Sequence, residues 1–121
     1  MDNTENSKQY DLEPRTLDFA KNVRVFVSNL NKSTANLEDG KQLIRSSGSI
    51  GANYIEANEA LSKKDFRLRI KICRKEAKES RYWLRLVDTQ PDSELQKVRM
   101  ELENEADELL KIFSAILQKT Q

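Results

Sequence analysis

Seven cationic side chains recur between residues 64 and 85 at spacings that alternate between three and four positions. This alternation is the repeat of one helix face, so the seven side chains form one row along a helix. A row of lysine and arginine suits contact with phosphate oxygens, because it can neutralise a nucleic-acid backbone. We call this row the basic ridge, and it consists of Lys64, Arg67, Lys71, Arg74, Lys78, Arg81 and Arg85.

An apolar seam follows the basic ridge along the same segment and explains how the helix would pack against its neighbours. The seam residues also recur every three or four positions, as a buried helix face requires. Together the two rows predict one continuous helix over residues 63–89, with one flank in the core and the other free for a ligand. The seam consists of Phe66, Ile70, Cys73, Ala77, Ser80, Leu84 and Val87.

Charge is unevenly distributed along a chain whose formal net charge is only +1. Residues 61–85 hold ten lysines and arginines against three acids, whereas residues 91–121 hold four against seven. The basic ridge therefore has two possible partners. It can bind a polyanion, or it can pair, within or between subunits, with acids of the last helix, namely Glu101, Glu103, Glu105 and Glu108.

The helix that carries the ridge has more apolar surface than one seam requires. A helix at the corner of a bundle can bury so wide a face, and an interface for self-association is the alternative. Trp83 suits such an interface because large aromatic side chains dominate interface hot spots. The additional apolar residues are Leu68, Ile72, Trp83 and Leu86.

The residue types argue against catalysis and against a bound metal or cofactor. The chain has no histidine, which is the commonest general base and metal ligand. Its one cysteine, Cys73, lies in the apolar seam and has no histidine to activate it. The Glu-x-x-His pairs that hold di-metal centres in helix bundles cannot occur here. We therefore expect a protein that is not an enzyme and needs no cofactor.

The segment over residues 36–61 combines small residues with a polar row. Glycine inside a helix costs about 1 kcal/mol relative to alanine, so Gly48 and Gly51 suggest close approach by a neighbouring backbone. The polar row is either a solvated face or part of a hydrogen-bonded cluster against the ridge-bearing helix. That structural polar cluster would consist of Arg45, Ser49, Asn53, Glu56, Glu76 and Glu79.

Helix start and stop signals divide the chain into four helices joined by short turns. The first should begin near Pro14, the second covers residues 36–61, and Ser62 opens a Ser-x-x-Asp variant of the capping box ahead of the third. Asp92 or Ser93 can cap the fourth helix. Because short loops favour antiparallel neighbours, we expect an all-α, antiparallel up-down-up-down four-helix bundle.

The bundle should form one domain over residues 14–121, preceded by a flexible tail at residues 1–13, which are polar and lack periodicity. No apolar run is long enough to span a bilayer, and no signal peptide is visible. We therefore expect a cytoplasmic protein with no membrane association.

The stretch QLIRSSGSIGANYIEANEALSKKDFRLRIKICRKEAKESRYWLRL closely resembles the bacterial four-helix-bundle proteins known as 23S rRNA intervening-sequence proteins. The likeness spans about residues 15–117, although the first and last helices match only in pattern. The chain departs from the family at Tyr54-Ile55 and at Asn58. The matching motifs are Arg45-Ser46, Ser49-Ile50-Gly51-Ala52-Asn53, Glu56-Ala57, Ser62-Lys63-Lys64-Asp65-Phe66, Lys75-Glu76-Ala77 with Glu79, and Tyr82-Trp83-Leu84.

The resemblance implies a four-helix bundle and a homo-oligomer, because related proteins assemble as pentameric rings. One relative, the accessory protein of diversity-generating retroelements, resembles a basic barrel that binds nucleic acid and a reverse transcriptase. The resemblance therefore implies RNA, DNA or a reverse transcriptase as partners, and it assigns no biochemical activity. Nucleic-acid binding through the basic ridge and a purely protein-binding scaffold both remain open at this point.

Overall fold

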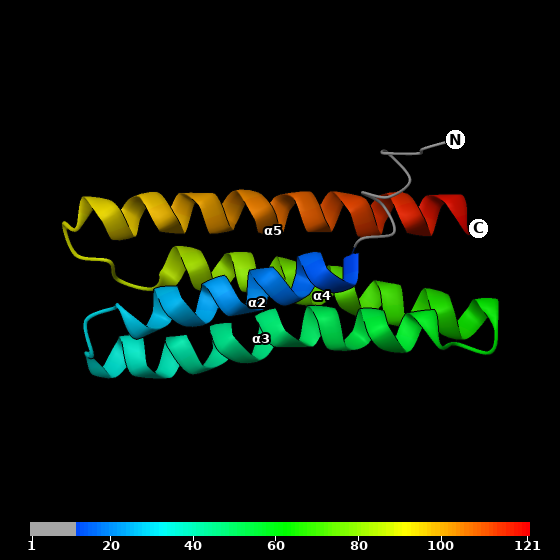
Figure 1. Ribbon diagram of the computed structural model, residues 1–121, viewed down its shortest axis with the longest axis horizontal. Coiled ribbons are helices and arrows are strands. Elements are labelled where there is room, and N and C mark those ends of the chain that lie inside the picture. The colour runs from blue at the N-terminus through cyan, green and yellow to red at the C-terminus, as the bar shows by residue number, and fades with distance from the viewer. Residues whose placement is uncertain (1–11) are drawn as a thin grey trace.

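A computed structural model describes residues 12–121, which form four α-helices packed as a bundle (Figure 1). The helices are α2 (Leu12–Ser28), α3 (Thr34–Asn58), α4 (Lys63–Leu86) and α5 (Ser93–Lys119). The first helix begins two residues before Pro14, and residues 1–11 of the expected tail lie outside the described residues. The predicted all-α four-helix class is confirmed.

Contacts between neighbouring helices run in opposite sequence order, so each helix is antiparallel to the next. Figure 1 shows the chain reversing direction at each of the three connections. Along α4 and α5, Arg67 reaches the carbonyl oxygen of Leu117, whereas Arg85 reaches Glu103. The same reversal appears between α3 and α4 in the pairs Ser46–Ser80 and Asn53–Arg69, and between α2 and α3 in Thr16–Gly51 and Val27–Gly40.

Short polar side chains begin three of the helices, as the sequence predicts for two of them. The hydroxyl oxygen of Ser62 accepts a hydrogen bond from the amide of Asp65 at 3.0 Å, and Asp92 accepts one from Leu95 at 3.0 Å. α3 begins earlier than expected because Ser33 serves as its N-cap. Each cap satisfies an amide that the first helical turn leaves without a partner.

The end of α4 was predicted wrongly, because the helix stops at Leu86 and not at residue 89. The cause is a contact with the distant helix α3. The side chain of Asn36 accepts a hydrogen bond from the amide of Asp88 and donates one to its carbonyl oxygen, both at 2.9 Å. This buried amide holds the segment after Val87 extended, and Val87 itself has a ψ of 149°.

The apolar seam of α4 lies in the core as predicted, with six of its residues buried and Phe66 half-buried. The second helix, predicted over residues 36–61, ends three residues early. Leu61 is 98% exposed and Asn58 is also exposed, because α3 ends at Asn58 and the chain then turns toward α4.

The two glycines of α3 differ in what they do. A Cβ at Gly51 would lie 2.8 Å from the hydroxyl oxygen of Thr16, so α2 approaches too closely for a larger residue. Among residues 12–121, no atom outside the local helix backbone lies within 4 Å of a Cβ at Gly48, so the expected close approach is wrong there. The buried Thr16 hydroxyl donates to the carbonyl oxygen of Leu12 at 2.7 Å, which fixes it in this contact.

Candidate nucleic-acid interface

The basic ridge divides into arginines that bind α5 and side chains that face solvent. Arg81 forms an ion pair with Asp107, and Arg85 forms one with Glu103 at 2.9 Å. Arg67 donates to the backbone of α5 at Leu117 and to the hydroxyl of Thr120. These three arginines hold α4 against α5, so much of their charge is already used within the chain.

The other four ridge residues have no hydrogen bond or ion pair to any residue in the range 12–121. Arg74 is half-buried, and the remaining three are exposed lysines. Lys75 is also exposed on the same face and has no ion pair among the described residues, although the sequence pattern of the ridge did not include it. We call the resulting outer row the lysine stripe, and it consists of Lys64, Lys71, Lys75 and Lys78.

The difference between the two sets follows from side-chain chemistry and from position on the helix. A guanidinium is a planar fork of donors that can bind a carboxylate or several oxygens at once, whereas an ammonium is a compact, strongly hydrated charge. Arg67, Arg74 and Arg81 repeat every seven residues on the flank nearer to α5. Lys64, Lys71 and Lys78 repeat every seven residues on the next row outward. From this row the longer Arg85 still reaches Glu103, but the lysines form no ion pair with any acid within residues 12–121.

The structural polar cluster forms in part between α3 and α4. Asn53 donates to the backbone and hydroxyl oxygens of Ser49 and accepts from Arg69 at 2.9 Å, and Arg45 lies 3.6 Å from Glu79. Arg69 was not among the residues that the sequence pattern assigned to this cluster. Glu56 is exposed, and its side chain has no hydrogen bond or ion pair within residues 12–121.

Glu76 is the member of this cluster with the least usual environment. It is only 6% exposed, and its Oε1 atom has no hydrogen-bond partner among the described residues. Burial raises the pKa of its carboxyl group, and the neighbouring charge of Glu79 raises it further against the opposing charges of Arg45 and Lys75. The group is therefore costly to ionise where it lies.

The apolar residues assigned to self-association lie at different depths. Leu68 is 56% exposed and Leu86 is 48% exposed, so both offer apolar surface to another molecule. Ile72 and Trp83 are half-buried, and Trp83 packs against the hydrophobic core and edge-on against the exposed ring of Tyr82. Trp83 therefore has a role inside the monomer as well as any role between subunits.

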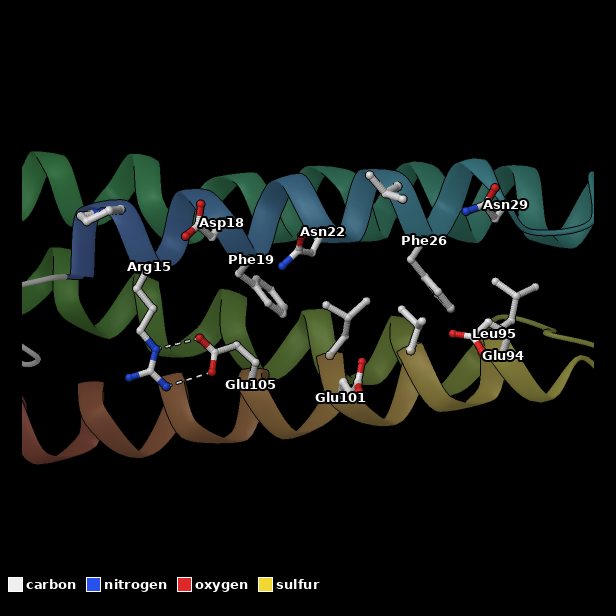
Figure 2. Close-up of a pocket in the computed structure, with 14 residues that line it drawn as sticks. Arg15, Asp18, Phe19, Asn22, Phe26, Asn29, Glu94, Leu95, Glu101 and Glu105 are labelled. Carbon is white, nitrogen blue, oxygen red and sulfur yellow. Dashed lines mark hydrogen bonds and ion pairs between the residues drawn. The ribbon is translucent and has the colours of Figure 1, made fainter.

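A groove between α2 and α5 was not anticipated from the sequence (Figure 2). It has a volume of about 1040 Å³ and an apolar floor that includes Phe19, Phe26 and Leu102. At one end Arg15 donates to both carboxylate oxygens of Glu105, at 2.7 and 2.9 Å. The hydrogen bonds to Glu105 raise the pKa of the Arg15 guanidinium, against the opposing effect of burial.

Groups that could support catalysis or metal binding are sparse in the described part of the chain. Residues 12–121 contain no cluster of three or more cysteine, aspartate and glutamate side chains placed to hold a metal ion. Cys73 is buried and donates to the carbonyl oxygen of Ile50 at 3.4 Å, and burial raises the pKa of its thiol to about 12. None of the four helices is apolar enough over a sufficient length to cross a membrane.

The fold and its charged faces define a class of small helical bundle with a basic outer helix and an acidic last helix. Residues 8–115 match the family model described as 23S rRNA-intervening sequence protein, so the chain belongs to that family. No functionally curated protein matches it.

Among solved structures, the chain is similar to a protein of unknown function from the S23 ribosomal protein family of Bacteroides thetaiotaomicron VPI-5482. The two are 30% identical, with a TM-score of 0.75, and the match covers 87% of this chain and 96% of the other. The resemblance inferred from the sequence motifs is thereby confirmed, and the function of that relative is itself unknown.

Proposed function

We propose that this protein is a non-enzymatic module that binds the phosphate backbone of RNA or DNA through the lysine stripe and Arg74. The observation that carries the proposal is a row of exposed ammonium groups on one helix face, none of which is neutralised by an acid within residues 12–121. Desolvated or paired charges attract a polyanion weakly, whereas this row remains available to it.

The pairing of ridge arginines with α5 lowers the number of phosphates that the face can neutralise. Five cations remain, counting the lysine stripe and Arg74. The affinity for nucleic acid should therefore fall with salt at a log–log slope of about −4, since each neutralised phosphate contributes about −0.7 to −0.9. Binding of this kind follows charge and shape and not base sequence.

Self-association would strengthen such binding by presenting several lysine stripes to one nucleic acid. The resemblance to ring-forming relatives supports a homo-oligomer, with a pentamer as the form to test, and the exposed Leu68 and Leu86 supply apolar contact area. A reverse transcriptase is a partner by the same resemblance alone. The proposal places the protein in the cytoplasm, where RNA would meet it.

A protein-binding scaffold without any nucleic-acid role is the second candidate. It is favoured by the three ridge arginines, Arg67, Arg81 and Arg85, which already bind groups of α5. In that case the lysine stripe would be a solvated face that keeps the bundle in solution.

The experiment compares two variants with the same change in net charge. The first reverses the lysine stripe by replacing Lys64, Lys71, Lys75 and Lys78 with glutamate, and the control replaces the exposed lysines Lys21, Lys32, Lys97 and Lys111. Retention of a structured RNA and of a DNA duplex is measured by filter binding from about 50 to 200 mM salt, with folding checked by circular dichroism.

The proposal expects wild-type affinity to fall by roughly 10²- to 10³-fold over that salt range, as a slope of about −4 requires. The stripe variant should lose retention at low salt, and the control should keep most of it. Equal retention by both variants would show that the stripe is not the binding face and would favour the scaffold.

A further inference from the structure

The groove between α2 and α5 has the shape of a site for another helix. α2 and α5 make the fewest contacts of the neighbouring helix pairs, and the groove runs along them from Arg15 and Glu105 to Asn29 and Glu94. At 1.5 Å per residue, the part of α2 from Arg15 to Asn29 is about 21 Å long. This length corresponds to about 14 residues, or four turns, of a docked helix.

The lining of the groove defines the chemistry of its occupant. The floor is apolar, and Phe19 and Phe26 from α2 and Leu102 from α5 are buried at its base. The half-buried Leu95 and Val98 and the exposed Val25 supply the apolar surface that an occupant can reach. Figure 2 shows the two phenylalanines pointing from α2 toward the apolar side chains of α5. An occupant with apolar side chains at spacings of three and four would cover this floor.

The rims carry negative charge that the described chain does not neutralise. Four acids and one arginine line the groove, and the arginine is already paired with Glu105. Asp18, Glu94 and Glu101 are exposed and form no ion pair within residues 12–121. Glu94 and Glu101 lie two helical turns apart on α5, so cations seven residues apart on an occupant would meet both.

Neither α4 of a second copy nor the sequence of residues 1–11 matches this surface. The strongly basic face is that of α4, but the exposed residues between Leu68 and Tyr82 are only Lys71, Lys75 and Lys78. A second copy of α4 would therefore place ammonium groups on the apolar floor. Their desolvation is unfavourable, because no acid on the floor pairs with them. The sequence of residues 1–11 carries three acids and one lysine, so it has the same sign of charge as the rims.

We propose that this groove docks a cationic amphipathic helix of a partner protein. Apolar anchors of that helix cover the accessible side chains of Val25, Leu95 and Val98, and lysines or arginines on its flanks pair with the acids of both rims. The groove lies on the far side of α5 from the ridge contacts with α4, so it can be occupied while the lysine stripe binds a polyanion.

The test uses the full chain and three synthetic 18-residue peptides. The first is an amphipathic helix with leucines at spacings of three and four and lysines elsewhere, the second has the same composition with the leucines scattered, and the third has glutamates in place of the lysines. Binding is measured by fluorescence anisotropy, and methyl NMR shifts at Val25, Leu95 and Val98 report whether the peptide lies in the groove.

The amphipathic lysine peptide should bind roughly tenfold or more tightly than the scattered one and should shift the groove methyl signals. Glu94→Lys with Glu101→Lys should weaken that binding roughly tenfold, which corresponds to about 1.4 kcal/mol. Glu56→Lys, an exposed site on α3 outside this groove, should leave it within about twofold.

Three results of the peptide experiment would overturn the proposal. These are equal binding of the two lysine peptides, preference for the glutamate peptide, or methyl shifts outside the groove. A fall in oligomer mass in light scattering on Glu94→Lys with Glu101→Lys would also overturn it, because a second copy would then be the occupant. RNA retention by the same variants reports on the lysine stripe separately, so the two proposals fail independently.

Discussion

The two sides of α5 are both acidic, but only one side is neutralised by its neighbouring helix. Toward α4, Arg81 and Arg85 reach Asp107 and Glu103, and the helices close against each other. Toward α2, Arg15 alone reaches Glu105, and a groove remains. The contrast shows that the adjacent helix decides the role of each acid on α5. Acids that face arginines form ion pairs within the bundle, whereas acids that face no cation can bind another molecule.

The same comparison explains how a chain of near-zero net charge comes to have two differently charged surfaces. Arginines of α4 use the acids on one side of α5 and leave lysines on the outer face of α4. On the opposite side of α5, Glu94 and Glu101 form no ion pair with any residue in the range 12–121. The lysine stripe and the acidic groove therefore have one cause, which is that α5 forms more ion pairs with α4 than with α2.

The largest predicted effect compares how tightly side chains pack in the core and at the groove, measured as the loss of stability on truncation to alanine. Phe113 is fully buried with its ring 6.2 Å from that of Tyr54, so Phe113→Ala should lower the free energy of unfolding by about 3–5 kcal/mol. Val98 is half-buried at the groove, so Val98→Ala should cost only about 1 kcal/mol. Urea denaturation followed by circular dichroism measures both values.

Similar losses for the two variants would mean that the groove is packed as tightly as the core, and the comparison would fail. Val25→Ala is a useful control, because Val25 lines the groove but is 60% exposed and should change stability by less than about 0.5 kcal/mol.

A smaller effect distinguishes the ion pairs on the two sides of α5. Arg15→Gln and Arg81→Gln should each lower stability by about 1 kcal/mol, since both pairs are partly exposed. They should differ in where the structure loosens. Hydrogen exchange should rise at the start of α2 in Arg15→Gln, because no second pair bridges α2 and α5, whereas Arg85 and Glu103 still join α4 to α5 in Arg81→Gln.

If amide hydrogens in both variants exchanged only through global unfolding, with no local increase at the start of α2, Arg15 would not hold this end of the groove in place. The matched variants Glu105→Gln and Asp107→Asn remove the acid of each pair instead, and they should reproduce the two patterns if the pairs themselves are responsible.

The sequence predicted the helices well because the pattern that defines them is local. Ile70, Cys73, Ala77 and Leu84 recur at helical spacing and are all buried. The end of α4 depends on Asn36, which lies in another helix. The residues near position 87 therefore carry no signal that predicts this end. Non-local hydrogen bonds of this kind override the periodicity of a segment.

The candidate sites were less predictable, because pairing and grooves depend on how helices are placed side by side. The sequence identified the ridge but could not tell that Arg67, Arg81 and Arg85 would reach α5. One available signal was the alternation of arginine and lysine within the ridge, since arginine is the residue better suited to multiple oxygen contacts. The groove gave no signal, because its width is a property of two helices that are distant in sequence.

An effect of similar size concerns Glu76, a buried acid whose Oε1 atom has no hydrogen-bond partner among the described residues. Because burial raises the pKa of Glu76 in the folded state above its ordinary value of 4.5, the native state holds this proton more tightly than the unfolded state. This contribution to stability is lost as the pH rises from about 4.5 through the raised pKa. Glu76→Gln keeps the shape and removes the ionisation.

Glu76→Gln should therefore match the wild type near pH 4 and exceed its stability by about 1 kcal/mol at pH 7, as for other buried groups left without a partner. Urea titrations at several pH values measure this difference. A constant difference across pH, or a less stable variant at pH 7, would mean that Glu76 is held ionised by Arg45 and Lys75. The α3–α4 seam would then resemble the paired side of α5, because nearby cations would offset the cost of its acid as they do for Glu103 and Asp107.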